Sequence, residues 1–206
     1  MAKLYFKFGA MGSSKSAQAL MTKFNYEEKN KNVFLMKPAT DDRGDVRDEY
    51  GNVIAEVRSR IGLTAPAVTV CDSDNIIDMY IERSKQQRVD VIICDECQFL
   101  TEAQIEQMKD IADIYDVPVL CFGLRADFRT RLFPGSKRLF EIADSITEIK
   151  SICRCGRKAT VNARIDGNGD ILTEGSQVFI GGNESYVGMC YKCYHEQIKK
   201  QKNRNN

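Results

Sequence analysis

The sequence predicts an α/β fold in which a parallel sheet carries helices on both faces and is followed by a small β unit. Three observations predict this fold. Short apolar runs alternate with amphipathic stretches over the first 150 residues, a glycine-containing turn joins the first run to the first stretch, and two tight cysteine pairs appear only after residue 150. Strands that alternate with helices favour a parallel sheet, because each parallel connection needs a crossover.

The first 38 residues predict a strand, a helix and a second strand. Residues 3–9 (KLYFKFG) are short, rich in aromatic side chains and end in a glycine turn. Residues 32–38 (NVFLMKP) form a second apolar run closed by proline. Between them, apolar side chains recur at helical spacing at Ala17, Leu20, Met21 and Phe24.

The same alternation continues to residue 150. Residues 40–53 are polar and contain two glycines, so we expect a surface excursion there. The other expected elements are a strand, a helix, a buried strand, a helix capped by Thr101 and a further buried strand, at 67–71, 75–87, 89–96, 102–115 and 117–124. We therefore expect four or five strands before residue 150.

The composition excludes several classes of protein. Hydrophobic residues make up 43% of the 206 residues and charged residues 29%, which is typical of a globular chain rather than a disordered or disulfide-stapled one. Thirty Lys and Arg against 29 Asp and Glu give a net charge of +1, which argues against nucleic acid as a partner. There is no membrane-length apolar run and no signal-peptide pattern, so we expect no membrane partner and a cytoplasmic location.

The turn after the first strand, GAMGSSKS, matches the P-loop pattern G-x-x-x-x-G-K-[ST] at all but one fixed position. Backbone N–H groups of such a loop surround phosphate oxygens at a helix N-terminus; the loop residues here are Gly9, Ala10, Met11, Gly12, Ser13, Ser14, Lys15 and Ser16. We expect Lys15 to reach the β- and γ-phosphates of ATP and Ser16 to offer its hydroxyl to Mg²⁺.

One position departs from that pattern, because Ser14 stands where the second glycine is expected. Gly12 lies two residues earlier and supplies part of the missing backbone freedom. The alternative interpretation is an ordinary strand–turn–helix junction with a solvated lysine. With the loop in this strand–helix context, the expected sheet is of the P-loop (RecA-like) type.

Two neighbouring carboxylates, Asp95 and Glu96, end a buried apolar run. Ligands of open α/β sheets gather at the carboxyl ends of the strands, so Asp95 is placed to hold Mg²⁺ opposite Ser16. Glu96 can serve as a base. The alternative is a pair of acids that cap the following helix.

Cysteines form two tight pairs late in the chain, at Cys153 and Cys155 and at Cys190 and Cys193. Two cysteine knuckles on either side of a hairpin are typical of a zinc ribbon, in which four thiolates hold a structural Zn²⁺. Residues 158–182 alternate as a hairpin would, with its turn at 166–170. The first knuckle, C-x-C, is one residue shorter than usual, and the alternative is a set of free core thiols.

The sequence resembles the type II, zinc-containing thymidine kinases from Leu4 to about Tyr194. The resemblance rests on the order and spacing of seven segments: GAMGSSKS (9–16), KPATDDR (37–43), SRIGL (59–63), DECQF (95–99), GLRADFRTRLFPGS (123–136), CRCGRKA (153–159) and VFIGGNESYVGMCYKCY (178–194). It implies transfer of the γ-phosphoryl group of ATP to the 5′-hydroxyl of thymidine, giving thymidine monophosphate.

The resemblance also implies roles at the phosphate end of the site. Glu96 matches the family's general base and Asp95 its magnesium-site aspartate, while Asp41 and Arg43 match a pair near the phosphates. Beyond the loop, the residues that it places around ATP are Asp41, Arg43, Asp95, Glu96, Cys97 and Gln98.

At the nucleoside end, the resemblance places aromatics around the thymine and a tyrosine at the deoxyribose, with the base held by a loop tied down by zinc. The residues concerned are Phe99, Leu124, Phe128, Phe133, Asn162, Phe179, Gly181 and Tyr186. The domains it implies are a P-loop nucleotide-binding domain (1–150), a zinc-ribbon and nucleoside-binding lasso domain (151–194) and a helix end with a disordered tail (195–206). Family members are usually tetramers inhibited by thymidine triphosphate (dTTP).

Two other functions remain open at this point. A P-loop ATPase would use the acid pair to activate water and would hydrolyse ATP without a nucleoside. A zinc-ribbon binding module with a degenerate nucleotide site would transfer no phosphoryl group at all. Another nucleoside, such as deoxyuridine, also remains open within the kinase interpretation.

Overall fold

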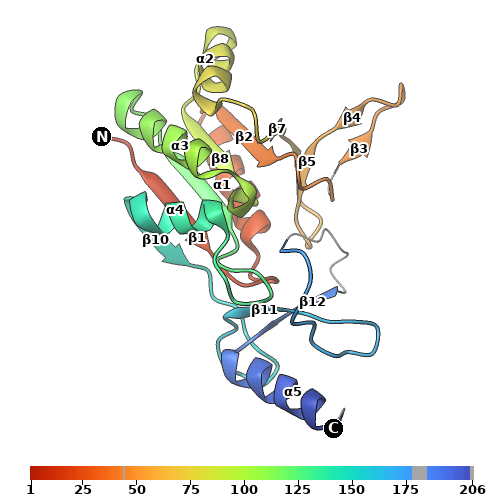
Figure 1. The fold of residues 1–206 in the computed structure, drawn as a ribbon. Coiled ribbons are helices and arrows are strands. Elements are labelled where there is room, and N and C mark those ends of the chain that lie inside the picture. Colours follow the sequence, from red (N-terminus) through yellow and green to blue (C-terminus); the bar gives the residue numbers. More distant parts are fainter. Residues whose placement is uncertain (44, 178–184, 205–206) are drawn as a thin grey trace.

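A six-stranded, all-parallel sheet forms the centre of the computed structural model, which describes residues 1–43, 45–177 and 185–204 (Figure 1). Its strand order is β10-β1-β9-β8-β2-β7. The strands are β1 (Leu4–Phe8), β2 (Val33–Pro38), β7 (Val68–Val70), β8 (Val91–Cys94), β9 (Val119–Gly123) and β10 (Ser145–Glu148). The predicted parallel sheet is confirmed; β10 was not among the expected strands.

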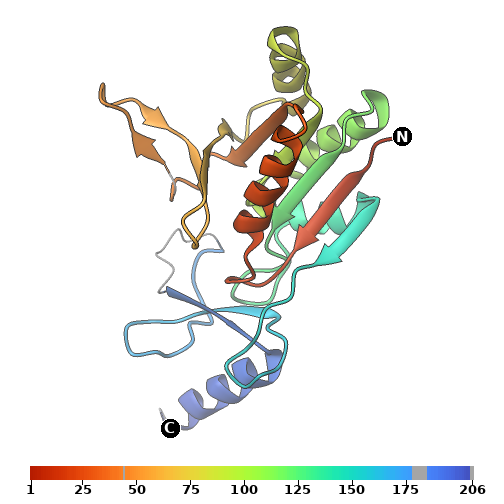
Figure 2. The ribbon, with the colours of Figure 1, turned by 180° about the vertical axis from the view of Figure 1, so that it is seen from behind.

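Helices cover both faces of this sheet, as predicted (Figures 1 and 2). They are α1 (Lys15–Glu27), α2 (Ile76–Gln86), α3 (Glu102–Ile114) and α4 (Pro134–Ile142). One core cluster joins Phe34 and Met36 of β2 to residues of α2, α3 and α4, and a second joins Leu35 of β2 to Leu20 of α1. Because alternate strand residues face opposite sides, β2 supplies both cores.

Side-chain caps fix where α2 and α3 begin. The carboxamide of Asn75 accepts hydrogen bonds from the backbone of Ile77 and Asp78 at the start of α2. Thr101 and Gln104 form a reciprocal capping box at the start of α3. The predicted cap at Thr101 is therefore confirmed.

The apolar stripe predicted for α1 is only half right. Ala17 and Leu20 are buried, but Met21 is 54% exposed and Phe24 60% exposed. The buried face of α1 passes instead through Ala19 and Tyr26, which pack in the cluster on this side of the sheet. The helix is therefore rotated away from the stripe that the spacing predicted.

Between β2 and β7 the chain leaves the sheet and forms two small hairpins rather than a plain polar excursion. They are β3 (Val46–Arg47) with β4 (Val53–Ile54), and β5 (Glu56–Arg58) with β6 (Thr64–Pro66). The fully buried Lys37 of β2 anchors them: its ammonium group donates to the carboxylate of Asp45 and to the backbone carbonyl of Glu56.

The C-terminal part contains the antiparallel pair β11 (Val161–Arg164) and β12 (Tyr186–Met189), followed by α5 (Tyr191–Arg204). The hairpin predicted within 158–182 is present around its turn: a bridge between Ile165 and Ile171 closes the turn at 166–170, and the backbone N–H of Leu172 donates to the carbonyl of Arg164. The strand partner of β11 is β12, which the sequence did not predict, and residues 178–182 lie outside the described residues.

Two further observations complete the description. Within residues 195–206, for which we expected a helix end and a disordered tail, α5 continues as far as Arg204. None of the helices in the described ranges combines the length and the apolar character that a membrane crossing requires.

Candidate active site

The phosphate loop lies between β1 and α1, as its sequence predicts. Gly12 has φ +78° and Ser14 has φ +63°, so both adopt the left-handed conformation. Ser14 thus takes the backbone geometry that the pattern normally assigns to glycine, although a side chain makes that geometry costly.

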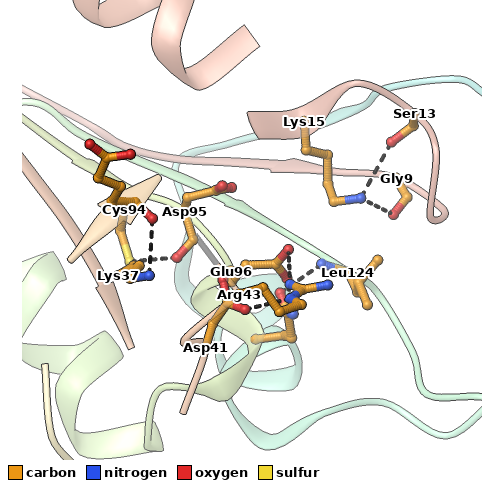
Figure 3. A network of polar contacts seen from close by, with 12 residues as sticks. Gly9, Ser13, Lys15, Lys37, Asp41, Arg43, Cys94, Asp95, Glu96 and Leu124 are labelled. Atoms are coloured by element: carbon orange, nitrogen blue, oxygen red, sulfur yellow. Dashed lines mark hydrogen bonds and ion pairs between the residues drawn. The ribbon is translucent and has the colours of Figure 1, made fainter. Parts of the chain in front are cut away.

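Lys15 is folded onto its own loop. Its buried ammonium group donates to the carbonyls of Gly9 (3.3 Å) and Ala10 (3.1 Å) and to Ser13 Oγ (3.5 Å) (Figure 3). Burial lowers the pKa of Lys15 below its ordinary value, while the charges of Glu96 and Asp95 oppose part of that shift. The lysine is therefore held close to the acid pair.

Asp95 directly follows β8 and is buried. The hydroxyl of Ser16, in the first turn of α1, favours the ionised form of this carboxylate. Its Oδ1 is buried without a partner among the described residues. Burial first, and the charge of Glu96 second, raise the pKa of Asp95 to about 7.

Glu96 has the opposite electrostatic character. Arg43 donates to its Oε1 at 2.8 Å, and Gln98 donates to its Oε2 (Figure 3). Burial alone would raise the pKa of Glu96, but the positive charges of Arg43 and Lys15 and the bond from Gln98 lower it below its ordinary value. The raised pKa of the pair therefore belongs to Asp95 and the lowered one to Glu96, because Arg43 pairs with Glu96.

Asp41, Cys97 and Gln98 lie around this pair in different roles. Asp41 accepts a hydrogen bond from Arg43 Nε and so orients the guanidinium. Gln98 Oε1 accepts from the backbone of Leu124 at 2.9 Å, while Cys97 is fully buried. Neither Cys97 nor Gln98 lines the cavity described next.

A cavity of about 360 Å³ joins the phosphate loop to a wall of aromatic side chains. Fifteen of the residues predicted for the site line it: Met11, Gly12, Ser14, Lys15, Ser16, Asp41, Arg43, Asp95, Glu96, Phe99, Leu124, Phe128, Phe133, Asn162 and Tyr186. Gly9, Ala10 and Ser13 form the back of the loop instead, and Phe179 and Gly181 lie outside the described residues.

The aromatic wall is packed from loops at the ends of β8 and β9. Phe99 and Phe133 meet edge to face at 5.6 Å between ring centroids. Phe128 is buried, and the guanidinium groups of Arg129 and Arg164 lie 5.4 and 5.5 Å from its ring centre. This end of the cavity thus offers flat apolar surfaces of the kind that accept a nucleobase.

Sequence reasoning missed one side of the cavity. Residues 56–61, from β5 and the turn after it, line it, as do Ala126, Asp127 and Gln177. The signals were present in SRIGL and GLRADFR, segments that carried the resemblance. These segments did not predict a role in the site by themselves, because only the fold brings the β5–β6 hairpin to the phosphate loop.

The four late cysteines meet in one place. The sulfur atoms of Cys153, Cys155, Cys190 and Cys193 all lie within 4.8 Å of one another. Cys155 and Cys190 sulfurs are 3.6 Å apart, close to the roughly 3.8 Å edge of a tetrahedron with Zn–S bonds of about 2.3 Å. The donor set and its spacing therefore fit a tetrahedral thiolate metal site.

A phosphate loop after β1, an acid pair at the end of β8 and aromatic side chains in the same cavity are typical of a nucleotide-binding enzyme of the P-loop class. The family model for thymidine kinase matches residues 2–194. The chain belongs to the thymidine kinase family, as the resemblance had predicted.

Curated relatives agree over nearly the whole chain. A thymidine kinase of Shewanella oneidensis is 43% identical over 198 residues, which cover 96% of this chain and 99% of that relative. One from Legionella pneumophila is 46% identical, covering 92% of this chain and 88% of the relative. One from Escherichia coli O157:H7 is 41% identical, covering 97% and 93%.

Proposed function

We propose that this protein transfers the γ-phosphoryl group of ATP to the 5′-hydroxyl of thymidine, giving thymidine monophosphate and ADP. The observation that carries the proposal is that Lys15, Asp95 and Glu96 line the same cavity as a cluster of aromatic side chains. Such a cavity can hold the triphosphate and a second, flat substrate together. Membership of the thymidine kinase family identifies that substrate as a nucleoside.

The phosphoryl transfer needs one proton acceptor, and Glu96 fits that role. Its lowered pKa keeps it ionised near neutral pH, so it can accept the 5′-hydroxyl proton as the oxygen attacks the γ-phosphorus. A bond forms from the 5′-oxygen to phosphorus, and the bond from phosphorus to the β–γ bridging oxygen breaks with the electron pair leaving on ADP.

Positive groups of the chain stabilise the charge on the moving phosphoryl group. Lys15 leaves its resting contacts with the loop carbonyls and reaches the phosphates, while the loop amides hold them. Arg43, oriented by Asp41 and paired with Glu96, lies beside the proton acceptor and contributes charge at the same end of the cavity.

Asp95 and Ser16 fit a Mg²⁺ site. The buried Oδ1 of Asp95 without a described partner and the adjacent Ser16 hydroxyl are oxygen ligands of the kind that Mg²⁺ prefers. When bound, the ion supplies positive charge against the phosphate oxygens. It would also favour the ionised form of Asp95, which burial disfavours in its absence.

The aromatic end would hold thymidine. Phe99, Phe128 and Phe133 contribute flat surfaces, Leu124 and Asn162 lie in the same wall, and Tyr186 comes from β12. The roles of Phe179 and Gly181 stay predictions. Residues 151–194 would form the nucleoside-binding part of the enzyme, with 1–150 as its nucleotide-binding part.

The cysteine cluster would hold a structural Zn²⁺. Four thiolates close the coordination shell, so the ion would stabilise the fold around β11 and β12 rather than take part in the reaction. From the family resemblance we also propose a homotetramer and inhibition by dTTP, whose base and phosphates would occupy the two ends of one continuous cavity.

A nucleoside panel tests the proposed substrate. The purified chain is incubated with labelled ATP, Mg²⁺ and either thymidine, deoxyuridine, deoxycytidine or a purine deoxynucleoside, and products are separated by chromatography. We expect labelled monophosphate with thymidine above all the others. No labelled nucleotide product from any nucleoside would contradict the proposal.

A further inference from the structure

One side chain of the β11–β12 pair bridges the two ends of the cavity. Asn162 of β11 is 5% exposed. Its Oδ1 accepts a hydrogen bond from the backbone N–H of Met11 at 2.7 Å, and its Nδ2 donates to the backbone carbonyl of Ala126 at 2.8 Å. Met11 belongs to the phosphate loop, and Ala126 lies in the loop that carries Phe128 and Phe133 into the aromatic wall.

The residue paired with Asn162 in the β11–β12 register approaches the same residue of the phosphate loop, Met11, at its other backbone group. Asn162 and Gly188 are partners in the β11–β12 register. A Cβ at Gly188 would lie 2.9 Å from the carbonyl oxygen of Met11, closer than real Cβ contacts come. The backbone of Gly188 needs no left-handed geometry, so close approach to Met11 is the reason that glycine fits here.

Apolar packing adds a third contact between the phosphate loop and the C-terminal unit, by which we mean the residues after position 150. Ala10 is buried in the same cluster as Cys153, Ala159 and Cys190. Two successive loop residues, Ala10 and Met11, therefore contact residues after position 150, and Met11, Gly12, Ser14 and Lys15 line the cavity. A phosphate loop binds phosphate through backbone N–H groups in fixed positions. Residues that pack against the side of the loop away from the ligand therefore also set the positions of those donors.

We propose that Asn162 and Gly188 are positioning residues for the phosphate loop, and that Asn162 couples the nucleoside end of the cavity to the ATP end. Asn162 holds both loops through separate bonds, whereas the atoms nearest to the Cβ position of Gly188 belong to Met11, Ala159 and Ala10. The proposal rests on the function proposed above, because it assumes that the loop binds ATP.

Direct binding measurements separate the two residues. On the full chain, calorimetry gives Kd for a non-hydrolysable ATP analogue with Mg²⁺ and, separately, for thymidine. Asn162→Ala should raise both Kd values about tenfold, the factor that corresponds to one lost buried hydrogen bond. Gly188→Ala should raise the Kd of the analogue by about the same factor and leave that of thymidine within about twofold of the original value.

Gly167→Ala is the matched control, because Gly167 has open space around its Cβ position and ordinary backbone geometry. It should leave both Kd values unchanged. Thermal unfolding of each variant gives the folded fraction at the temperature of the binding measurement. If Asn162→Ala does not fold, the comparison of Gly188→Ala with Gly167→Ala still tests whether this contact positions the phosphate loop.

Unchanged affinity for the analogue in Gly188→Ala, or equal weakening of both ligands in that variant, would overturn the positioning role. Unchanged thymidine affinity in Asn162→Ala would overturn the coupling. If the unaltered chain itself binds no ATP analogue, the proposed function fails first, so the two failures are distinguishable.

Discussion

Two adjacent carboxyl groups in this site have pKa values shifted in opposite directions, and the contacts of each group explain the difference. Asp95 is buried beside Ser16 with one oxygen unpartnered among the described residues, and its pKa is raised to about 7. Glu96 pairs instead with Arg43 and Gln98, which lower its pKa. The two acids therefore suit different tasks, cation binding for Asp95 and proton acceptance for Glu96.

Glu96→Gln should lower kcat by about 10²–10⁴-fold, the usual contribution of a general base. The amide keeps the size of the side chain but cannot accept the 5′-hydroxyl proton. Binding of the ATP analogue, measured by calorimetry, should stay within a few-fold of the original value. An unchanged kcat would remove Glu96 from the role of base.

Asp95 should make the ligand-free protein less stable as pH rises. Its pKa of about 7 in the folded state lies above the ordinary 3.8, so between these values the unfolded chain releases a proton that the folded chain keeps. The free energy of unfolding then falls from about pH 4 to pH 7 and levels off above. The measurement is urea unfolding in magnesium-free buffer at several pH values.

Asp95→Asn removes this titration. The variant should gain stability relative to the original chain at pH 8, with little difference at pH 4, while Mg²⁺-dependent binding of the ATP analogue is lost. A variant that is less stable than the original at pH 8 would contradict the buried, partly unsatisfied state of Asp95.

At the scale of elements, β5 and the turn after it form a wall of the cavity, and one buried ion pair ties the segment between β2 and β5 to the sheet. Lys37 is fully buried and pairs with Asp45, whose carboxylate also accepts from the backbone of Glu56 at 3.2 Å. This contact fixes the start of β5, and residues 56–61 line the cavity beside the phosphate loop.

Lys37→Met should destabilise the fold by about 3 kcal/mol, because it leaves the carboxylate of Asp45 partly buried without its partner. The double variant Lys37→Met with Asp45→Asn should recover part of that loss. Urea unfolding gives both values. Equal stability of the single variant and the original chain would show that the pair does not anchor the hairpins.

The elements that could be predicted from sequence are those with local signals. The phosphate loop, the cap at Thr101 and the buried runs at β8 and β9 each depend on neighbouring residues alone. The partner of β11 could not be predicted, because it lies beyond a long intervening segment. The exposure of Met21 and Phe24 depends on how α1 is rotated on the sheet, and helical spacing alone does not fix that rotation.

The residues of the site also divide into those that a local sequence motif predicts and those that only the fold brings together. Lys15, Asp95 and Glu96 were predicted from motifs with known chemistry. The contact of Asn162 with Met11 joins residues 151 positions apart, and no local sequence pattern predicts it. Residues 56–61 were missed for the same reason.

At the scale of the molecule, the cavity is complete only where two parts of the chain meet. The sheet unit supplies the phosphate loop and the acid pair, and the C-terminal unit supplies Asn162 and Tyr186. The cysteine cluster lies in the C-terminal unit and packs against Ala10 of the loop. Stability of that unit should therefore matter at both ends of the cavity.

Metal removal tests this dependence. The purified chain should carry about one zinc per molecule, and Cys190→Ser should lose it together with thymidine binding. Hydrogen exchange should rise in β11 and β12 and change little in β1 and β8. Cys71→Ser is the matched control, because Cys71 is exposed and lies outside the cluster. Full zinc content in Cys190→Ser would contradict the proposed metal site.

The amount of ADP formed per thymidine monophosphate tests the central claim most directly, because a kinase and an ATPase built on the same loop differ in that ratio. With ATP, Mg²⁺ and thymidine, we predict one ADP for each thymidine monophosphate, and almost no ADP when thymidine is left out. Equal release of ADP with and without thymidine, and no nucleotide product, would contradict the assignment and identify the chain as an ATPase.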